Sequence, residues 1–165
     1  MFRAKTPYTY AQDKITDYLT HYSGVMGELR DFYSFSKNPL RAILLFITPG
    51  VNKLSVFVNA VKTGGMFDIK NQSEWQYQYG STTREKAMTE YMYYNSRLWS
   101  AEQLGNFAFG YFGAAYGYGV EFLGFGAGMY QIVSGTSDWS FFSSYFDDPI
   151  DNAYIRLGHS QYWSR

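Results

Sequence analysis

The sequence predicts a mainly α-helical fold, a compact single-domain helical bundle with a short irregular or β segment around residues 65–80. Apolar residues recur at helical spacing along most of the chain, and residues that cap helices precede several of these stretches. The length of 165 residues suits one domain with a sizeable core. We therefore expect residues 1–165 to form one domain, in which residues 1–37 provide an N-terminal helix packed on the rest.

Three helices are expected before residue 65. Residues 9–33 begin with a pattern that fits a capping box and then carry apolar residues at helical spacing. A short apolar run follows Asn38, which is a suitable N-cap, and this run stops at a Thr-Pro-Gly sequence. Residues 52–62 repeat the helical spacing, and Gly64 can end this helix in the left-handed conformation.

The middle of the chain is expected to pass from an extended to a helical structure. Aromatic residues alternate with polar ones around Trp75, which is typical of a short β region. Thr82 and Glu85 fit another capping box, and the apolar residues after them predict a helix that runs to about Trp99. Glu90 would lie within this helix.

Glycine and aromatic residues alternate over residues 104–135, where Glu121 is the only charged residue. Each glycine inside a helix costs about 1 kcal/mol relative to alanine, so close packing of neighbouring elements must offset that cost. Ser100 and Gln103 fit a capping box just before this segment. We expect two close-packed helices, broken near residues 117–119.

An acidic segment precedes the last predicted helix. Asp148 is a suitable N-cap, Pro149 suits the first helical turn, and Asp151 would lie near the positive end of the helix. These structural roles explain the segment by themselves. Together with Asp147, however, the segment holds three carboxylates, which also fit cation binding or a general acid. This helix is expected to end at about Gly158.

Composition narrows the classes of function. Fourteen basic and fourteen acidic residues give a net charge of zero, so no excess charge attracts the chain to nucleic acid or to an anionic membrane. The lack of cysteine excludes disulfides and thiolate catalysis. Aromatic residues make up 21% of the chain, and surface rings favour stacking on sugars, bases or a partner protein. We recognise no signal peptide and expect another machine or a fused carrier to deliver the protein.

Three short motifs follow one another along the chain: Gly64-Gly65-Met66-Phe67-Asp68-Ile69-Lys70, Gly105-Asn106-Phe107-Ala108-Phe109-Gly110-Tyr111-Phe112-Gly113 and Asp147-Asp148-Pro149-Ile150-Asp151. Their order and spacing resemble those of the bacterial polymorphic toxin type 44 domain family. The resemblance covers about residues 38–163. It implies a toxin domain that a secretion system or a larger carrier protein delivers to competing bacteria, with a cognate immunity protein as partner.

The resemblance also implies a candidate site, made of Asp68, Lys70, Asn106, Gly110 and the group Asp147, Asp148 and Asp151. Two positions depart from the family pattern. Met66-Phe67 stands where a proline and a tryptophan are common, and Ala108 stands where many relatives have a histidine. If that histidine is catalytic in the relatives, this chain uses another group or is inactive.

The residue types favour carboxylate chemistry. A metal-independent ribonuclease usually needs histidine or lysine as acid and base, and only His21 and His159 are present, each of which is explained as a surface or core residue. Glycoside hydrolysis instead needs two carboxylates about 5 to 10 Å apart and a groove lined with rings. Glu90 and Glu121 are candidate acids, because aromatic neighbours would desolvate them and favour the protonated form.

Other members of the expected site complete this chemistry. The carboxylates that could act with either glutamate are Asp68, Asp147 and Asp148. Lys70 is a further candidate, as a base. The residues expected to bind substrate are Asn106, Trp75, Tyr111 and Asp151. We expect no bound metal and no cofactor.

These observations favour an antibacterial effector that hydrolyses the glycan of peptidoglycan by a lysozyme-like mechanism, acting in the periplasm of a target cell. The alternative is a cytoplasmic nuclease toxin that uses Lys70 with the acidic cluster. A third hypothesis is insertion of residues 104–135 into a membrane as a hairpin. It is disfavoured, because each half has fewer than about 16 residues and a spanning helix needs about 20. A non-enzymatic binding module is a further alternative.

Overall fold

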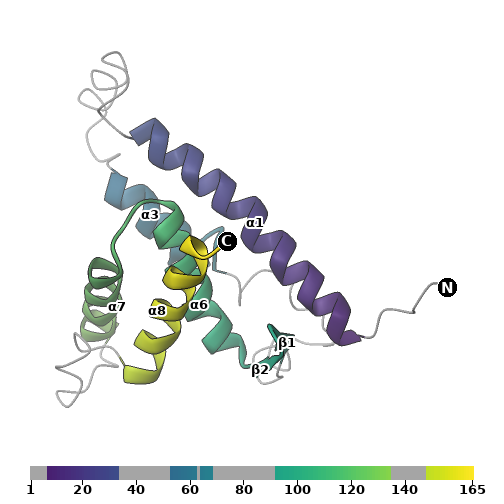
Figure 1. Cartoon of the computed structure of the whole chain (residues 1–165). Coiled ribbons are helices and arrows are strands. Elements are labelled where there is room, and N and C mark those ends of the chain that lie inside the picture. Colours follow the sequence, from purple (N-terminus) through teal and green to yellow (C-terminus); the bar gives the residue numbers. More distant parts are fainter. Residues whose placement is uncertain (1–6, 34–52, 63, 69–91, 135–147) are drawn as a thin grey trace.

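The structure is a computed structural model, and it describes residues 7–33, 53–62, 64–68, 92–134 and 148–165. Helices dominate these residues, as the fold class predicted from the sequence requires. In chain order the elements are α1 (Pro7–Tyr33), α3 (Lys53–Val61), β1 (Met92–Tyr94), β2 (Arg97–Trp99), α6 (Ala101–Ala115), α7 (Val120–Ser134) and α8 (Pro149–Trp163) (Figure 1). Figure 1 shows α1 and α7 on opposite sides of the pair formed by α6 and α8.

Helix α1 packs on α6 through one apolar stripe. Ile15, Leu19 and Met26 recur at intervals of four and seven residues, and each of them is buried. The ring centroid of Tyr18 lies 5.9 Å from that of Phe112 in α6. The helix predicted for this part of the chain is therefore confirmed, and its two glycines do not interrupt it. Its expected capping box, which begins at Thr9, is wrong, because α1 already begins at Pro7.

The chain reverses direction directly after α3. Gly64 has a φ of +76°, in the left-handed region that favours glycine. Gly65 is also required, because a Cβ at this position would overlap the carbonyl oxygen of Ala60. The backbone N–H of Phe67 donates to that same oxygen over 2.8 Å. The predicted helix end at Gly64 is confirmed.

Residues 92–99 form an antiparallel hairpin in which Met92 pairs with Trp99. Its turn residues, Asn95 and Ser96, have φ angles of 47° and 60°, as a two-residue type I′ turn requires. The helix predicted to continue to about Trp99 is therefore wrong over these residues. Asparagine tolerates the left-handed conformation, and the aromatic residues on both sides of the turn suit paired strands.

Helix α6 begins at the predicted capping box. Oγ of Ser100 accepts from the N–H of Gln103 over 3.1 Å, and Oε1 of Gln103 accepts from the N–H of Ser100 over 3.0 Å. The helix gives way to α7 around Gly117, whose φ is +87°. A Cβ on Gly113 would lie 2.5 Å from the side chain of Leu123, so this glycine lets α7 approach α6. The predicted pair of helices and the break between them are confirmed.

Helices α6 and α8 approach one another through two glycines. A Cβ on Gly110 would overlap the carbonyl oxygen of Ile155, and a Cβ on Gly158 would overlap that of Phe107. The predicted end of the last helix at about Gly158 is wrong, because α8 continues to Trp163. Gly158 serves the contact with α6 and does not terminate the helix.

These two helices run in the same direction (Figure 1). Ring contacts between the two helices follow the same order along both of them. The ring centroids of Trp99, just before α6, and of Tyr154 lie 5.2 Å apart, and those of Tyr111 and Tyr162 lie 5.5 Å apart further along. The N-terminal part of α8 therefore lies beside the start of α6, and the C-terminal parts of the two helices also lie beside each other.

Several predicted stretches lie outside the described residues. They are the short helix after Asn38, the part of the irregular or β segment beyond residue 68, the helix start at Thr82, and the loop before Asp148.

Candidate functional site

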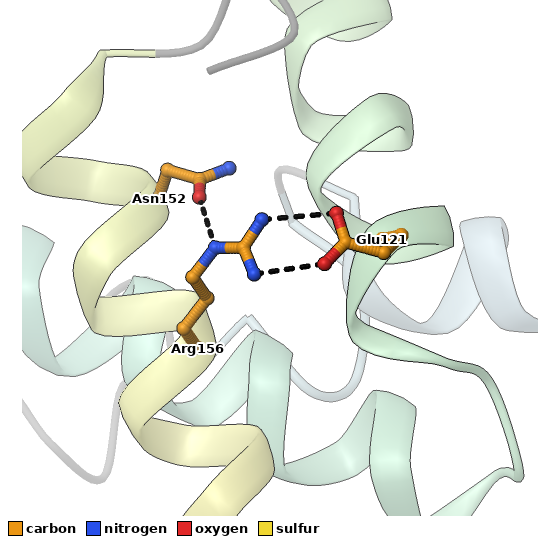
Figure 2. A network of polar contacts seen from close by, with 3 residues as sticks. All are labelled: Glu121, Asn152 and Arg156. Carbon is orange, nitrogen blue, oxygen red and sulfur yellow. Dashed lines mark hydrogen bonds and ion pairs between the residues drawn. The ribbon is translucent and has the colours of Figure 1, made fainter. Parts of the chain in front are cut away.

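A network of three polar side chains joins α7 to α8 (Figure 2). Arg156 donates to both carboxylate oxygens of Glu121, from Nη1 to Oε1 over 2.9 Å and from Nη2 to Oε2 over 3.0 Å. Its Nε donates to Oδ1 of Asn152 over 2.8 Å. Two parallel hydrogen bonds fix the orientation of a carboxylate as well as its position. The network therefore holds an acidic group of α7 in a defined place against α8.

The local sequence explains why these side chains meet. Asn152 and Arg156 are four residues apart in α8, so they lie on the same face of the helix. Glu121 lies in the first turn of α7, where unpaired backbone N–H groups favour a negative charge. The side chains of Arg156 and Glu121 are 44% and 60% exposed. The desolvated surroundings expected for Glu121 are thus absent, and its carboxylate faces solvent beside a guanidinium.

Two asparagines of the α6–α8 pair each have a buried side-chain nitrogen, Nδ2, with no hydrogen-bond partner among the described residues. Asn152 is 5% exposed, and Asn106 is partly buried. Buried polar groups in folded proteins almost always have a protein, water or ligand partner. Each of these two donors therefore lacks a partner that water or a ligand oxygen can supply.

Both asparagines precede one close contact between α6 and α8. Asn106 precedes Gly110 by one turn, and Asn152 precedes Ile155 by one turn. Gly110 and Ile155 touch, and the two helices run in the same direction. Asn106, which the family resemblance placed in the site, and Asn152, which it did not, thus each precede the contact between Gly110 and Ile155 on their own helix.

The acidic start of α8 lies one turn before Asn152. Oδ1 of Asp148 accepts from the backbone N–H of Ile150 over 2.7 Å, so the predicted N-cap is confirmed. The carbonyl oxygen of Asp148 accepts from the N–H of Asn152 over 2.9 Å. Asp151 lies in the first turn of the helix. The catalytic role of Asp148 and the substrate-binding role of Asp151 stay predictions.

Asp68 lies in another part of the molecule, in the turn after α3. Its side chain is buried, and its Oδ2 accepts from the backbone N–H of Gly64 over 2.8 Å. The ring centroid of Phe67, its neighbour, lies 5.1 Å from that of Tyr22 in α1 and 5.2 Å from that of Phe112 in α6. The structure therefore places Asp68 beside α1, whereas Glu121 lies at the junction of α7 and α8.

Tyr111, expected to bind substrate, lies in the core between α6 and α8. It is 5% exposed. The guanidinium of Arg165 lies 5.0 Å from its ring centroid. Burial raises the pKa of Tyr111, although the charge of Arg165 opposes this effect. Four other expected site residues lie outside the part of the chain that the structure describes: Lys70, Trp75, Glu90 and Asp147.

The remaining residues raised by the sequence lie on helices of the bundle. Ala108, where many relatives have a histidine, is fully buried at 0% exposure, so a larger side chain there would have to displace its neighbours. Nε2 of His159 lies 3.1 Å from the carbonyl oxygen of Tyr118. His21 is exposed on α1 and packs edge-on against Tyr22.

Sequence reasoning missed Arg156 and Asn152. One signal could have drawn attention to them, because Arg156 is the only lysine or arginine in α8 and follows Asn152 by one helical turn. The partner Glu121 is 35 residues away in the sequence, so local spacing could not identify it.

Comparison with known proteins identifies the family of this chain. The family model described as bacterial toxin 44 matches residues 56–164, which include α6, α7, α8 and the Glu121–Arg156–Asn152 network. No curated protein and no solved structure matches the chain. The match confirms the resemblance carried by the three motifs, and helix α1 lies before the matched range. This chain is a bacterial toxin domain that belongs to the bacterial toxin 44 family.

Proposed function

We propose that this toxin domain hydrolyses the glycan strands of peptidoglycan, with its active site at the junction of α7 and α8. The observation that carries the proposal is the exposed carboxylate of Glu121, which Arg156 holds through both oxygens. Cleavage of a glycosidic bond needs two carboxyl groups on opposite sides of the bond. This junction offers one fixed carboxylate, and we assign the second to the acidic start of α8, two helical turns before Arg156.

The hydrogen bonds of Glu121 suggest its role in the reaction. Both of its oxygens accept from a guanidinium, the arrangement of an ionised carboxylate. We therefore assign Glu121 the part of base or nucleophile, in place of the acid expected from the sequence. The proton donor would then come from the acidic segment that includes Asp147, Asp148 and Asp151.

The surroundings of Glu121 favour a sugar substrate over nucleic acid. Phe125 follows Glu121 by one helical turn and is 52% exposed, so an aromatic ring lies on the same face of α7 for a sugar to stack on. Arg156 is already paired with Glu121, and the acids at the start of α8 would repel phosphate groups. Both features disfavour a polyanionic substrate at this site.

Purified peptidoglycan provides the direct test. We expect the wild type to release new reducing sugar ends, and Glu121→Gln to slow this release by about 100-fold or more, as the loss of an acid–base group does. Glu102→Gln is the matched control, because Glu102 is also an exposed glutamate in the first turn of a helix, α6. The two variants should be about equally stable, since exposed ion pairs contribute about 1 kcal/mol or less. Intact glycan strands after long incubation would contradict the proposal.

Expression in bacteria with and without a periplasmic export signal separates the other hypotheses. A wall hydrolase delivered by a secretion system should kill only after export, and its cognate immunity protein should protect from within the periplasm. Killing without export would favour the nuclease that uses Lys70. No helix within the described ranges is long and apolar enough to cross a membrane. Dye release from liposomes would test insertion directly.

A further inference from the structure

The side-chain amide of Asn152 has a fixed orientation. The Nε of Arg156 can only donate, so the amide atom 2.8 Å from it must be the oxygen. The other atom is therefore the nitrogen, Nδ2, which is buried without a partner in the described part of the chain. Figure 2 shows this nitrogen directed away from Arg156 and toward the side of α7. The network thus presents an N–H donor whose direction is set by the same guanidinium that holds Glu121.

Asn106 supplies a second buried nitrogen without a partner among the described residues. It belongs to α6, one helical turn before Gly110. The backbones of the two helices meet where Gly110 contacts Ile155, about one helical turn after each asparagine. Each helix of this pair therefore carries one buried amide nitrogen without a partner among the described residues.

The groups around these donors select a neutral acceptor. An amide N–H cannot bind a cation, which excludes a metal ion at this position. An anion such as phosphate would be repelled by the carboxylate of Glu121, and Arg156 is already neutralised by Glu121. A neutral carbonyl oxygen accepts from an amide N–H without these repulsions.

The depth of the network limits the size of the ligand group. Glu121 and Arg156 are 60% and 44% exposed and form its outer part. Asn152, at 5% exposure, forms its inner end. A whole sugar ring is too large for this inner end, and even a small substituent reaches Nδ2 only when the surrounding side chains shift, because this nitrogen has almost no exposed surface.

We propose that Asn152 donates a hydrogen bond to the carbonyl oxygen of an acetamido group on an N-acetylated amino sugar, and so positions that sugar at Glu121. This inference rests on the proposed function, because it names the sugar substituent that the same site recognises. Asn152 is a substrate-binding residue in this arrangement.

The test compares the full chain with its Asn152→Asp variant, which keeps the acceptor for Arg156 and replaces the donor nitrogen by oxygen. Calorimetry would measure binding of two tetramers with the same β-1,4 linkage, one of N-acetylglucosamine and one of glucose. We expect the variant to bind the acetylated tetramer about tenfold or more weakly than the wild type, as the loss of one hydrogen bond predicts. Asn95→Asp is the matched control, because it makes the same change in the exposed turn of the hairpin.

A second measurement does not depend on how the variant folds. In the wild type, the side-chain amide NMR signals of Asn152 should shift when the acetylated tetramer is added and stay unchanged with the glucose tetramer. An unchanged signal, equal binding of the two tetramers, or equal binding by Asn152→Asp would overturn the proposal and leave water as the only acceptor. A short N-acetylated peptide amide that binds as tightly as the acetylated tetramer would overturn the sugar as the source of the carbonyl.

Peptidoglycan cleavage, measured in parallel, separates this inference from the proposed function. Binding that depends on Asn152 without any cleavage of glycan would support the inference and contradict the function. Cleavage that is unaffected both by Asn152→Asp and by chemical deacetylation of the wall would support the function and overturn the inference.

Discussion

Gly110 is a residue at which one methyl group would decide how α6 and α8 pack. A Cβ at this position would overlap the backbone carbonyl of Ile155, and a backbone group cannot rotate away as a side chain does. Gly110→Ala should therefore force the helices apart and lower the free energy of unfolding by about 2–3 kcal/mol. Urea unfolding followed by circular dichroism measures this change. Because Asn106 and Asn152 lie next to the contact, the variant should also bind acetylated sugars less tightly.

Gly24→Ala is the control for this prediction. Gly24 also lies inside a helix, α1, but a Cβ there would have nothing within 4 Å. The change should raise the free energy of unfolding by about 0.5–1 kcal/mol through helix propensity alone. If both substitutions had the same effect, the close contact at Gly110 would not be the reason for its glycine.

Residue types alone led to part of the candidate site. The cap at Asp148 follows from an aspartate before a proline, because both residues have strong local preferences at a helix start. Glu121 stood out as the only charge in a long apolar segment. Its exposure and its pairing with Arg156 could not be predicted, since they depend on where α8 returns to α7. The unpartnered nitrogen of Asn152 is a property of packing and leaves no trace in the sequence.

At the scale of elements, the start of α8 has a structural role that can be separated from a chemical one. Asp148 caps the helix through Oδ1. Asparagine caps as well as aspartate, whereas alanine does not. Asp148→Asn should therefore keep the stability of the wild type, and Asp148→Ala should lose about 1 kcal/mol in thermal or urea unfolding.

The same pair of variants tests whether the Asp148 carboxylate takes part in wall cleavage. If it does, Asp148→Asn should lose activity on peptidoglycan although its stability is kept. Full activity in both variants, with reduced stability in Asp148→Ala alone, would restrict Asp148 to its role as a cap. The proton donor would then have to be sought in Asp147 or Asp151.

The hairpin of β1 and β2 shows where pattern reading failed at this scale. Apolar residues before and after the turn fitted a helical period, and a helix was predicted through them. The turn itself, Asn95 and Ser96 with positive φ, interrupts any helix. The indole Nε1 of Trp99 also donates to the carbonyl oxygen of Tyr94 over 2.7 Å. This hydrogen bond joins β2 to β1. The helices that begin after Ser100 and Asp148 were predicted well, because a cap and a periodic stripe agree there. The same two signals after Thr82 did not prevent a wrong prediction for residues 92–99.

At the scale of the molecule, α1 lies before the range that the family model matches, yet it supplies part of the core. Its Ile15, Leu19 and Met26 are buried. Its side chains also bind distant parts of the chain. Nη1 of Arg30 donates to the carbonyl oxygen of Ala115 over 3.3 Å, and Oγ of Ser23 accepts from Nη1 of Arg165 over 3.1 Å.

Removal of residues 1–33 should therefore abolish cooperative unfolding of the remainder. Each large apolar residue that loses its partner forfeits about 1.5–3 kcal/mol of burial, and the total stability of a domain is only about 5–15 kcal/mol. Thermal unfolding followed by near-ultraviolet circular dichroism compares the shortened chain with the full one. A sharp transition at an unchanged temperature would show that α1 is an appendage and not part of the same domain.

The response of the whole molecule to alkaline pH follows from its buried tyrosines. Burial raises the pKa of Tyr94, Tyr111 and Tyr118 above the ordinary value of 10.0, and in Tyr94 the neighbouring Tyr111 adds to the effect. The unfolded chain therefore releases these protons at lower pH than the folded one. Above about pH 10 the unfolded state binds fewer protons, so the free energy of unfolding falls as pH rises.

Lys53 acts in the opposite direction. Burial, and then the charge of Arg30, lower its pKa from 10.5. Between that lowered pKa and 10.5 the unfolded state holds the proton more tightly, so this lysine alone makes stability rise with pH. Up to pH 10.5 the rise in the free energy of unfolding caused by Lys53 partly cancels the fall caused by the tyrosines. Above pH 10.5 only the fall continues.

We therefore expect the free energy of unfolding to fall most steeply above about pH 10.5, when urea unfolding is measured at constant ionic strength. Tyr118→Phe is the informative variant, because burial alone raises the pKa of Tyr118 and the substitution removes the ionisable hydroxyl. It keeps the ring, whose centroid lies 5.0 Å from that of Phe57. The variant should lose less stability than the wild type over the same alkaline interval. An equal loss in both proteins would mean that ionisation of Tyr118 does not contribute to alkaline unfolding.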